Sequence, residues 1–571
     1  MDTGNEQMRE NSSLQYKRFY RTMPIPASLV LLLLFFVPLF FTLSSAFITE
    51  EGISFSRVVG VFTDSYTQRI MLFTVFQATI STLASLLVAL PGAFLIATYN
   101  FRAKRLILAL SAIPFVIPSI LVVLGFVIFF GNNGFLNRIL MTLFNLNEPP
   151  LKILYSFPAI ILAHTFYNFP IIMSLVSSYW EHMDGHCESA SRTLGATKTR
   201  TFFSITLPRL LPAIISACSL VFLFCFNSFA IILVLGGGPQ FTTMEVEIYR
   251  QARMMSNPGA ASALSLFSIL VTTLLLLWYN ASQKNLARSE IYRRDILRSE
   301  KRPASFVGRV LALFYTLFSL LFILGPIISV VVRSFMASPS RSASQEFSLR
   351  WYRQLLSLES ATGHMGSALT ALTNSFMIAL VVATLTVPVA LTLSVAVRRS
   401  QRKTSFYELF GMLPMTVSSV IIGLGYYLIS SRFRAGLSLH YILVVLAHMV
   451  IAIPFVLRTI LPEYRKIPLS YMHSSLTLGA GPLRTFLLIE LPLLKGSLFT
   501  GAIFAFALSM GEFNATLTLA NSSIVTLPIV MYRLIGSYNF QGACALGTIL
   551  IAVSVIVFIV SELAKGGKYG Q

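Results

Sequence analysis

The sequence predicts an all-α polytopic membrane protein of two related halves, with about 12 transmembrane helices. Three observations lead to this fold class. Of its 571 residues, 55% are hydrophobic and 11% are charged, and the mean hydropathy is +0.75. The apolar residues gather in long runs, and one polar loop occurs twice, with Gly195 and Gly479 lying 284 residues apart. These properties exclude an ordinary soluble globular protein.

Each half contains six apolar stretches of the length that a membrane helix needs. A helix rises 1.5 Å per residue, so roughly 20 apolar residues cross about 30 Å of hydrocarbon. In the first half the stretches lie near 27–47, 70–98, 105–130, 152–178, 211–235 and 258–280. In the second half they lie near 306–334, 370–397, 405–431, 439–461, 493–520 and 542–563. The first stretch is longer than a typical signal-peptide core, so we expect it to be a retained helix.

The distribution of Lys and Arg predicts the orientation of the chain in the bilayer. With a cytoplasmic N-terminus, the segments predicted to be inside contain about 30 of the 43 basic residues, as the positive-inside rule requires. Six helices are an even number, so both halves enter the membrane in the same direction and form a parallel repeat. Both copies of the polar loop then face the cytoplasm.

These patterns predict five segments. A cytoplasmic N-terminus (1–24) precedes the first half (25–280), and a basic cytoplasmic linker (281–305) leads to the second half (306–563) and a cytoplasmic tail (564–571). Although the net charge is +21, the basic linker is typical of a positive-inside loop, so we expect no nucleic-acid partner.

The sequence contains no pattern that indicates catalysis, a metal or a cofactor. The four cysteines lack metal-ligand spacing, and neither a nucleotide-binding G-x-x-x-x-G-K-[ST] loop nor an H-E-x-x-H motif occurs. We therefore expect a transport subunit rather than an enzyme. If transport is active, another chain must hydrolyse ATP.

The duplicated loop covers about residues 185–210 and 469–494. Glycine permits a sharp turn, and proline starts the next helix without losing a hydrogen bond. The repeated positions are Gly195, Ala196, Ile205, Leu207 and Pro208 in the first copy, and Gly479, Ala480, Ile489, Leu491 and Pro492 in the second.

A glycine followed ten to thirteen residues later by Ile-x-Leu-Pro, before the penultimate helix of a six-helix unit, resembles the signature of type I ABC importer permeases. The usual Glu-Ala-Ala opening is altered to Ser189-Ala190-Ser191 and His473-Ser474-Ser475, with Glu188 one place early. The resemblance implies that each loop docks on an ATP-binding-cassette ATPase, in two copies. It also implies an extracytoplasmic solute-binding protein, alternating access and a bacterial cytoplasmic membrane.

Fusion of two halves in one chain resembles the thiamine and ferric-ion permeases. The stretches Leu162–Pro170, Phe226–Ala230, Leu235–Gln240 and Gly511–Phe513 are most similar to the thiamine group. The resemblance implies thiamine or its phosphates as the solute, with ferric ion as the alternative. A major facilitator is an alternative of another class, but its basic loop between the second and third helices is not evident at Asn100–Arg105.

Matching positions of the two halves supply candidate residues for a translocation path. Glu512 is the acidic residue that lies well inside a predicted span, and an ionisable group there should face protein or water. With the paired rings of Phe229 and Phe513, its carboxylate would suit a cationic aromatic solute. The alternative is that Glu512 bonds to a neighbouring helix and that the rings are packing. His164 and His448 are expected to form interhelical hydrogen bonds rather than an ion path.

Glycines at the outer end of the fifth helix predict a flexible gate near a docked partner. The candidate path and gate residues are Asn227, Ser228, Phe229, Gly236, Gly237, Gly238, Gly511, Glu512 and Phe513.

Overall fold

The structure is a computed structural model, and it describes most of the chain. The described residues are 18–49, 52–101, 103–183, 185–236, 238–291, 302–303, 306–337, 347–356, 368–399, 404–433, 436–520 and 524–566. Almost all of them are helical. Strand pairing among them is confined to two-residue segments: β1 (Ile48–Thr49) with β2 (Gly52–Ile53), and β3 (Tyr99–Asn100) with β4 (Arg302–Pro303). The predicted all-α class is confirmed.

Eleven helices among the described residues are long and apolar enough to cross a membrane, and a bent pair makes a twelfth. The eleven are Arg18–Phe47, Ser65–Thr98, Ser119–Phe144, Phe157–Glu181, Lys198–Phe226, Pro258–Tyr279, Phe306–Ser334, Ala368–Arg399, Ser438–Lys466, Pro482–Met510 and Phe540–Val557. The pair Phe406–Thr416 and Ser419–Arg432 is bent by 84°. The count agrees with the prediction of about 12 spans.

The first half begins with a continuous helix that contains one π-helical turn, and it continues through the first polar loop. Its elements are α2 (Pro24–Leu31), η1 (Leu32–Phe36), α3 (Val37–Phe47), α4 (Ser56–Thr63), α5 (Ser65–Thr98), α6 (Lys104–Val116), α7 (Ser119–Phe130), α8 (Phe135–Phe144), α9 (Phe157–Glu181), α10 (His186–Thr193), α11 (Lys198–Thr201), η2 (Phe202–Thr206), α12 (Leu207–Phe226), α13 (Ala230–Leu235), η3 (Pro239–Phe241), α14 (Met244–Tyr249), η4 (Arg250–Met254) and α15 (Pro258–Ile291).

The second half repeats this order. Its elements are α16 (Phe306–Ser334), α17 (Arg350–Leu356), α18 (Ala368–Arg399), α19 (Thr404–Met412), η5 (Leu413–Thr416), α20 (Ser419–Arg432), α21 (Leu437–Lys466), α22 (Leu469–Thr477), α23 (Pro482–Thr485), η6 (Phe486–Glu490), α24 (Leu491–Met510), α25 (Asn514–Leu519), α26 (Leu527–Gly536) and α27 (Phe540–Gly566).

The third and fifth predicted spans of each half are broken rather than continuous. In the third span of the first half, Pro118 precedes α7 in an extended conformation with a ψ of 144°. Proline also disfavours the helical conformation in Ile117, the residue before it. In the second half, Ser418 caps α20 by accepting a hydrogen bond from the backbone of Ile421. The fifth spans break between α12 and α13 and between α24 and α25, at 227–229 and 511–513. Such interruptions are typical of membrane segments that line a cavity.

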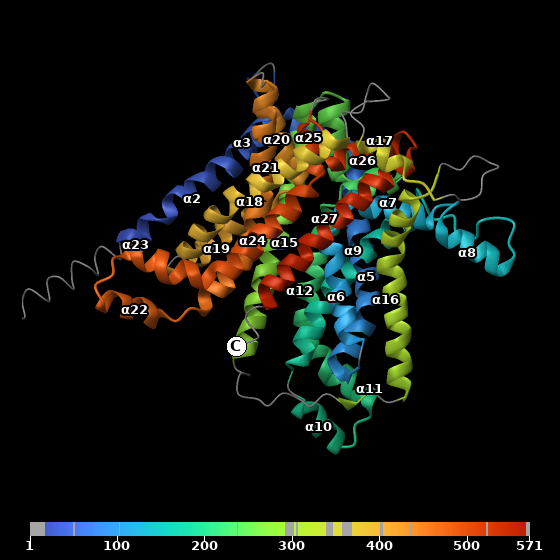
Figure 1. Cartoon of the computed structure of the whole chain (residues 1–571), viewed down its shortest axis with the longest axis horizontal. Helices are drawn as coiled ribbons and strands as arrows, with labels where there is room; N and C mark the ends of the chain where they lie inside the picture. The colour runs from blue at the N-terminus through green and yellow to red at the C-terminus, as the bar shows by residue number, and fades with distance from the viewer. Residues whose placement is uncertain are drawn as a thin grey trace, which may run out of the picture.

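Each half extends its first helix onto the other half. The segment α2 to α3 lies along the second-half helices α18 and α20, and α16 lies along α5, α6 and α7 (Figure 1). The Tyr426 hydroxyl donates to the backbone oxygen of Leu34 at 2.8 Å, and the Tyr315 hydroxyl donates to that of Val88 at 3.1 Å. A Cβ at Gly425 would lie 2.5 Å from the Pro38 oxygen, so α3 and α20 cross where no side chain fits. The two halves therefore form one interlocked bundle.

Candidate functional site: the two polar loops and the interface between the halves

The two polar loops have the same local structure. After α10 and after α22 the chain turns through a glycine in the left-handed region, with φ of +85° at Gly195 and +77° at Gly479. In each copy the glycine and the following alanine donate backbone hydrogen bonds to the preceding helical turn, at 3.0 to 3.1 Å. The second short helix of each loop, α11 or α23, leads into the π-helical turns η2 and η6. In Figure 1, α10 and α11 lie at the lower end of the molecule, and α22 and α23 lie at its left edge.

A leucine at the tip of each turn is almost fully exposed. Leu194 is 88% exposed and Leu478 is 87% exposed, at matching positions just before the two glycines. The matching exposure of one leucine on each loop makes these two side chains the candidates for contact with a partner protein. Leucine belongs to the repeated motif, but exposure of its side chain depends on the turn and is not evident from the motif.

The other predicted loop residues lie on the return path to the membrane. Ile205 and Ile489 are half-buried within η2 and η6, and Leu207 and Leu491 are half-buried at the start of the next helix. Pro208 and Pro492 follow the π-helical turns η2 and η6 directly, within the continuous helices Lys198–Phe226 and Pro482–Met510. A hydrogen bond between Ser191 and Thr201, 3.0 Å long, closes the first loop, and Ser475 and Thr485 bond in the same way in the second.

The two loops differ in the position of their carboxylate. In the first, Glu188 on α10 accepts a hydrogen bond from the Thr206 hydroxyl at 2.6 Å. In the second, methionine replaces this glutamate at 472, and Glu490 occupies the position of the threonine. The fully buried Glu490 pairs with Arg399 at 2.6 Å and accepts hydrogen bonds from Tyr464 and, at 2.7 Å, from Tyr20. Sequence reasoning missed this cluster because its members are far apart in the chain.

Four aromatic rings meet where the broken fifth helices of the two halves face each other. The rings of Phe229 and Phe513 are 6.1 Å apart between centroids, and both side chains are 1% exposed. Tyr249 lies 5.4 Å from Phe229, and Tyr532 lies 5.3 Å from Phe513, in the same pattern. This aromatic cluster lies in the interface between the halves. Gly511 of the second half can lie close to Pro118 of the first because it has no side chain: a Cβ there would be 2.5 Å from Pro118.

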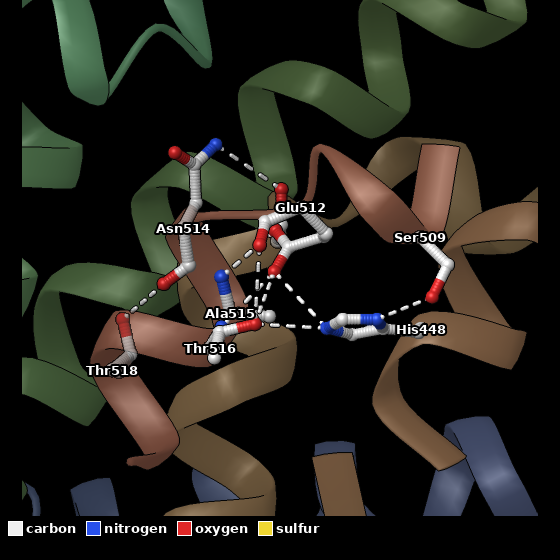
Figure 2. Close-up of polar contacts among 8 residues, drawn as sticks. His448, Ser509, Glu512, Asn514, Ala515, Thr516 and Thr518 are labelled. Atoms are coloured by element: carbon white, nitrogen blue, oxygen red, sulfur yellow. Dashed lines mark hydrogen bonds and ion pairs between the residues drawn. The ribbon is translucent and has the colours of Figure 1, made fainter. Parts of the chain in front are cut away.

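Glu512 forms hydrogen bonds within the protein, as the second of the two interpretations expects, and Figure 2 shows these contacts. Its carboxylate accepts hydrogen bonds from the backbone N–H groups of Ala515 and Thr516 at 2.9 and 3.0 Å, and from the Thr516 hydroxyl at 3.0 Å. His448 lies 3.4 Å from the same carboxylate and bonds to Ser509 and Thr516 at 2.8 Å. The carboxylate thus caps the start of α25. His448 links α21 to α24 and α25, which confirms the interhelical interpretation of this histidine.

The predicted glycine gate is described in part. Gly236 ends α13, and Gly238 adopts a φ of +112°, a conformation that favours glycine. Gly237 lies outside the described residues.

A cavity of about 250 Å³ lies beside the aromatic cluster, between the halves. It is lined by Ser119, His164, Tyr167, Asn168, Ile171, Phe224, Asn227, Ser228, Phe229, Ala230 and Ile231 of the first half, and by Phe455, Leu508 and Asn514 of the second. The structure thus brings the predicted residues Asn227, Ser228 and Phe229 together at one cavity. Glu512 is not among the lining residues. Within the described part of the chain, no three His, Cys, Asp or Glu side chains are placed to hold a metal ion.

Comparison with known proteins identifies related chains over most of this length. A family model described as "Binding-protein-dependent transport system inner membrane component" matches residues 82–288 and 387–564. The thiamine transport system permease protein ThiP of Brucella abortus is 27% identical over 88% of this chain and 89% of its own length. ThiP of Escherichia coli is 26% identical over 89% and 91%. The spermidine/putrescine permease protein PotB of Escherichia coli is 29% identical over 44% of this chain and 94% of its own length.

Proposed function

This chain belongs to the family of binding-protein-dependent transport system inner membrane components, and we propose that it is the permease of an ABC importer for thiamine or its phosphates. As a member it is a multi-pass transport component of the inner membrane. Because the chain belongs to this family, it is not a major facilitator. The ATPase, the binding protein, the solute and the orientation of the termini are parts of the proposal.

The observation that carries the proposal is the paired loop structure. Two loops with the same left-handed glycine and the same exposed leucine would bind two copies of one ATPase, one on each half. Leu194 and Leu478 would enter apolar clefts of those subunits, and the half-buried Ile205 and Ile489 would transmit their movement to α12 and α24. The excess of basic residues in the segments predicted to be inside supports a cytoplasmic location for these loops.

Thiamine as the solute is supported by the relatives that align with nearly the whole chain. The ThiP proteins of Brucella abortus and Escherichia coli share both halves of the fused architecture with it, whereas PotB covers less than half of this chain. The described residues that line the cavity include no carboxylate and no cysteine, and His164 and Tyr167 are the two among them of a type that binds iron, which is fewer than a ferric site needs.

The proposed mechanism is alternating access. A loaded binding protein docks outside, and ATP binding closes the two ATPase subunits inside. The two loops carry that closure to α12 and α24, which hold the aromatic cluster at their outer ends. Separation of Phe229 from Phe513 would then open the path. ATP supplies the energetic bias between the two states.

ATP-dependent uptake of labelled thiamine tests the proposal. Proteoliposomes would contain this chain, its ATPase and its binding protein, with ferric ion as a parallel substrate. We expect thiamine uptake that stops without ATP. Uptake of ferric ion instead of thiamine would contradict thiamine as the solute. Uptake without an ATPase would contradict the ATP-driven mechanism.

A further inference from the structure

The cavity between the halves contains polar atoms that have no hydrogen-bond partner in the part of the chain that the structure describes. Four such buried atoms belong to residues that line it: Nε2 of His164 and the Oδ1 atoms of Asn168, Asn227 and Asn514. His164 is 1% exposed and Asn168 is 2% exposed. A buried polar atom without a hydrogen bond is costly, so such a group in a native structure requires an explanation.

The internal repeat shows that this arrangement is specific to the first half. His448, the counterpart of His164, has both ring nitrogens bonded, to Ser509 and to Thr516. In the first half, isoleucine at 232 takes the place of that threonine and Ser228 takes the place of Glu512. His164 therefore keeps a bond from Nδ1 to Ser81 at 2.9 Å, while its Nε2 stays open beside the cavity.

Neighbouring contacts fix which hydrogen-bonding groups are open to a ligand. The Asn168 amide nitrogen donates to the backbone oxygen of His164 at 2.9 Å, which leaves its carbonyl oxygen as an acceptor. The Asn514 amide nitrogen lies 3.4 Å from Ser419, and Figure 2 shows its carbonyl oxygen directed away from Glu512. In the tautomer in which Nδ1 of His164 accepts from Ser81, Nε2 carries the hydrogen and is a donor. The cavity then offers several acceptors and one donor, beside the rings of Phe224 and Phe229.

We propose that this cavity binds the aminopyrimidine ring of the solute during its passage through the permease. An amino group next to a ring nitrogen supplies donors for the asparagine oxygens and an acceptor for His164 Nε2, and a flat ring packs against the phenylalanines. A volume of about 250 Å³ lies just below the range of about 300 to 1,000 Å³ of small-molecule sites, so it suits one small ring compound. This inference rests on the proposed thiamine function.

Equilibrium binding of labelled thiamine to the permease tests the inference. The full-length chain with its ATPase would be held in lipid nanodiscs, without nucleotide and without binding protein. Asn168→Leu removes the carbonyl acceptor, together with the amide group that donates to the His164 oxygen, and keeps the number of side-chain heavy atoms. Asn133→Leu, in an exposed turn outside the cavity, is the matched control. Oxythiamine, in which an oxo group replaces the amino group, tests the same contact on the unaltered protein.

We expect saturable binding of thiamine that weakens about tenfold in Asn168→Leu and about tenfold for oxythiamine, since one unpaired buried group costs about that much affinity. Asn133→Leu should bind as the wild type does. Thiamine uptake without saturable binding, or binding that neither change weakens, would overturn the inference and leave the proposed function standing. Absence of thiamine uptake in the complete system would overturn the proposed function, and with it this inference.

Discussion

Replacement of Glu512 should reveal whether its carboxylate holds the structure together or binds the solute. The structure gives the carboxylate four contacts: two backbone N–H groups, the Thr516 hydroxyl and His448. The four contacts meet at the buried junction between α24 and α25, which the His448 side chain reaches from α21. The contacts predict that Glu512 acts on stability first and on transport second.

The magnitude follows from the donors that each substitution leaves without an acceptor. Glu512→Ala strands the N–H groups of Ala515 and Thr516 in a buried site, at about 1 to 3 kcal/mol each, or about 2 to 6 kcal/mol together. Glu512→Gln keeps one carbonyl oxygen, so only one of the two N–H groups loses its acceptor, and the loss of stability is about 1 to 3 kcal/mol. Glu148→Ala is the control, because its exposed pair with Lys152 contributes about 0 to 1 kcal/mol.

The assay is the half-life of the monodisperse, detergent-solubilised permease at a fixed elevated temperature, together with ATP-dependent thiamine uptake per folded molecule. A half-life is the suitable quantity where unfolding is irreversible. We expect the half-life to be longest for the Glu148→Ala control, shorter for Glu512→Gln and shortest for Glu512→Ala. Uptake per folded molecule should change little in Glu512→Gln. A wild-type half-life in Glu512→Ala combined with loss of uptake would refute the structural role and restore the solute-binding interpretation.

Three further predictions concern the loops and the aromatic cluster. Valine at both Gly195 and Gly479 should let ATP hydrolysis continue while uptake per ATP falls, because each left-handed turn then costs about 1 to 2 kcal/mol; unchanged uptake would contradict the coupling role. Glu490→Gln removes the buried carboxylate that pairs with Arg399, so a loss of about 3 to 5 kcal/mol should shorten the thermal half-life, and an unchanged half-life would contradict the cluster's role. Phe229→Ala should make proteoliposomes leak labelled thiamine without ATP, and liposomes as tight as those of the wild type would show that the cluster is not the barrier.

Properties carried by contiguous residues could be predicted from the sequence. The apolar runs predicted about 12 spans because hydrocarbon solubility depends on the composition of a stretch rather than on its neighbours. The left-handed turns at Gly195 and Gly479 followed from the local requirement for glycine. The breaks in the third and fifth spans were not predicted, because apolar residues on both sides of Pro118 and of Asn227 hide a change of direction.

Contacts between distant segments were beyond the reach of the sequence. The pattern identified Glu512 as unusual and left two interpretations open, because the choice depended on whether His448 and Thr516 lie close enough to bond with it. The pair of Arg399 and Glu490 gave no signal, since the two residues are 91 positions apart and Glu490 is the variable position of the Ile-x-Leu-Pro motif.

By itself, the sequence determined that this chain crosses the membrane in two parallel halves and presents a matching polar loop from each. Only the tertiary structure decided how the two copies differ. Equivalent histidines have different partners because a hydrogen bond depends on a few ångströms of separation and on the residue that the neighbouring helix of the same half presents. The second half supplies Thr516 and Glu512 to His448, whereas the first half leaves His164 beside a polar cavity.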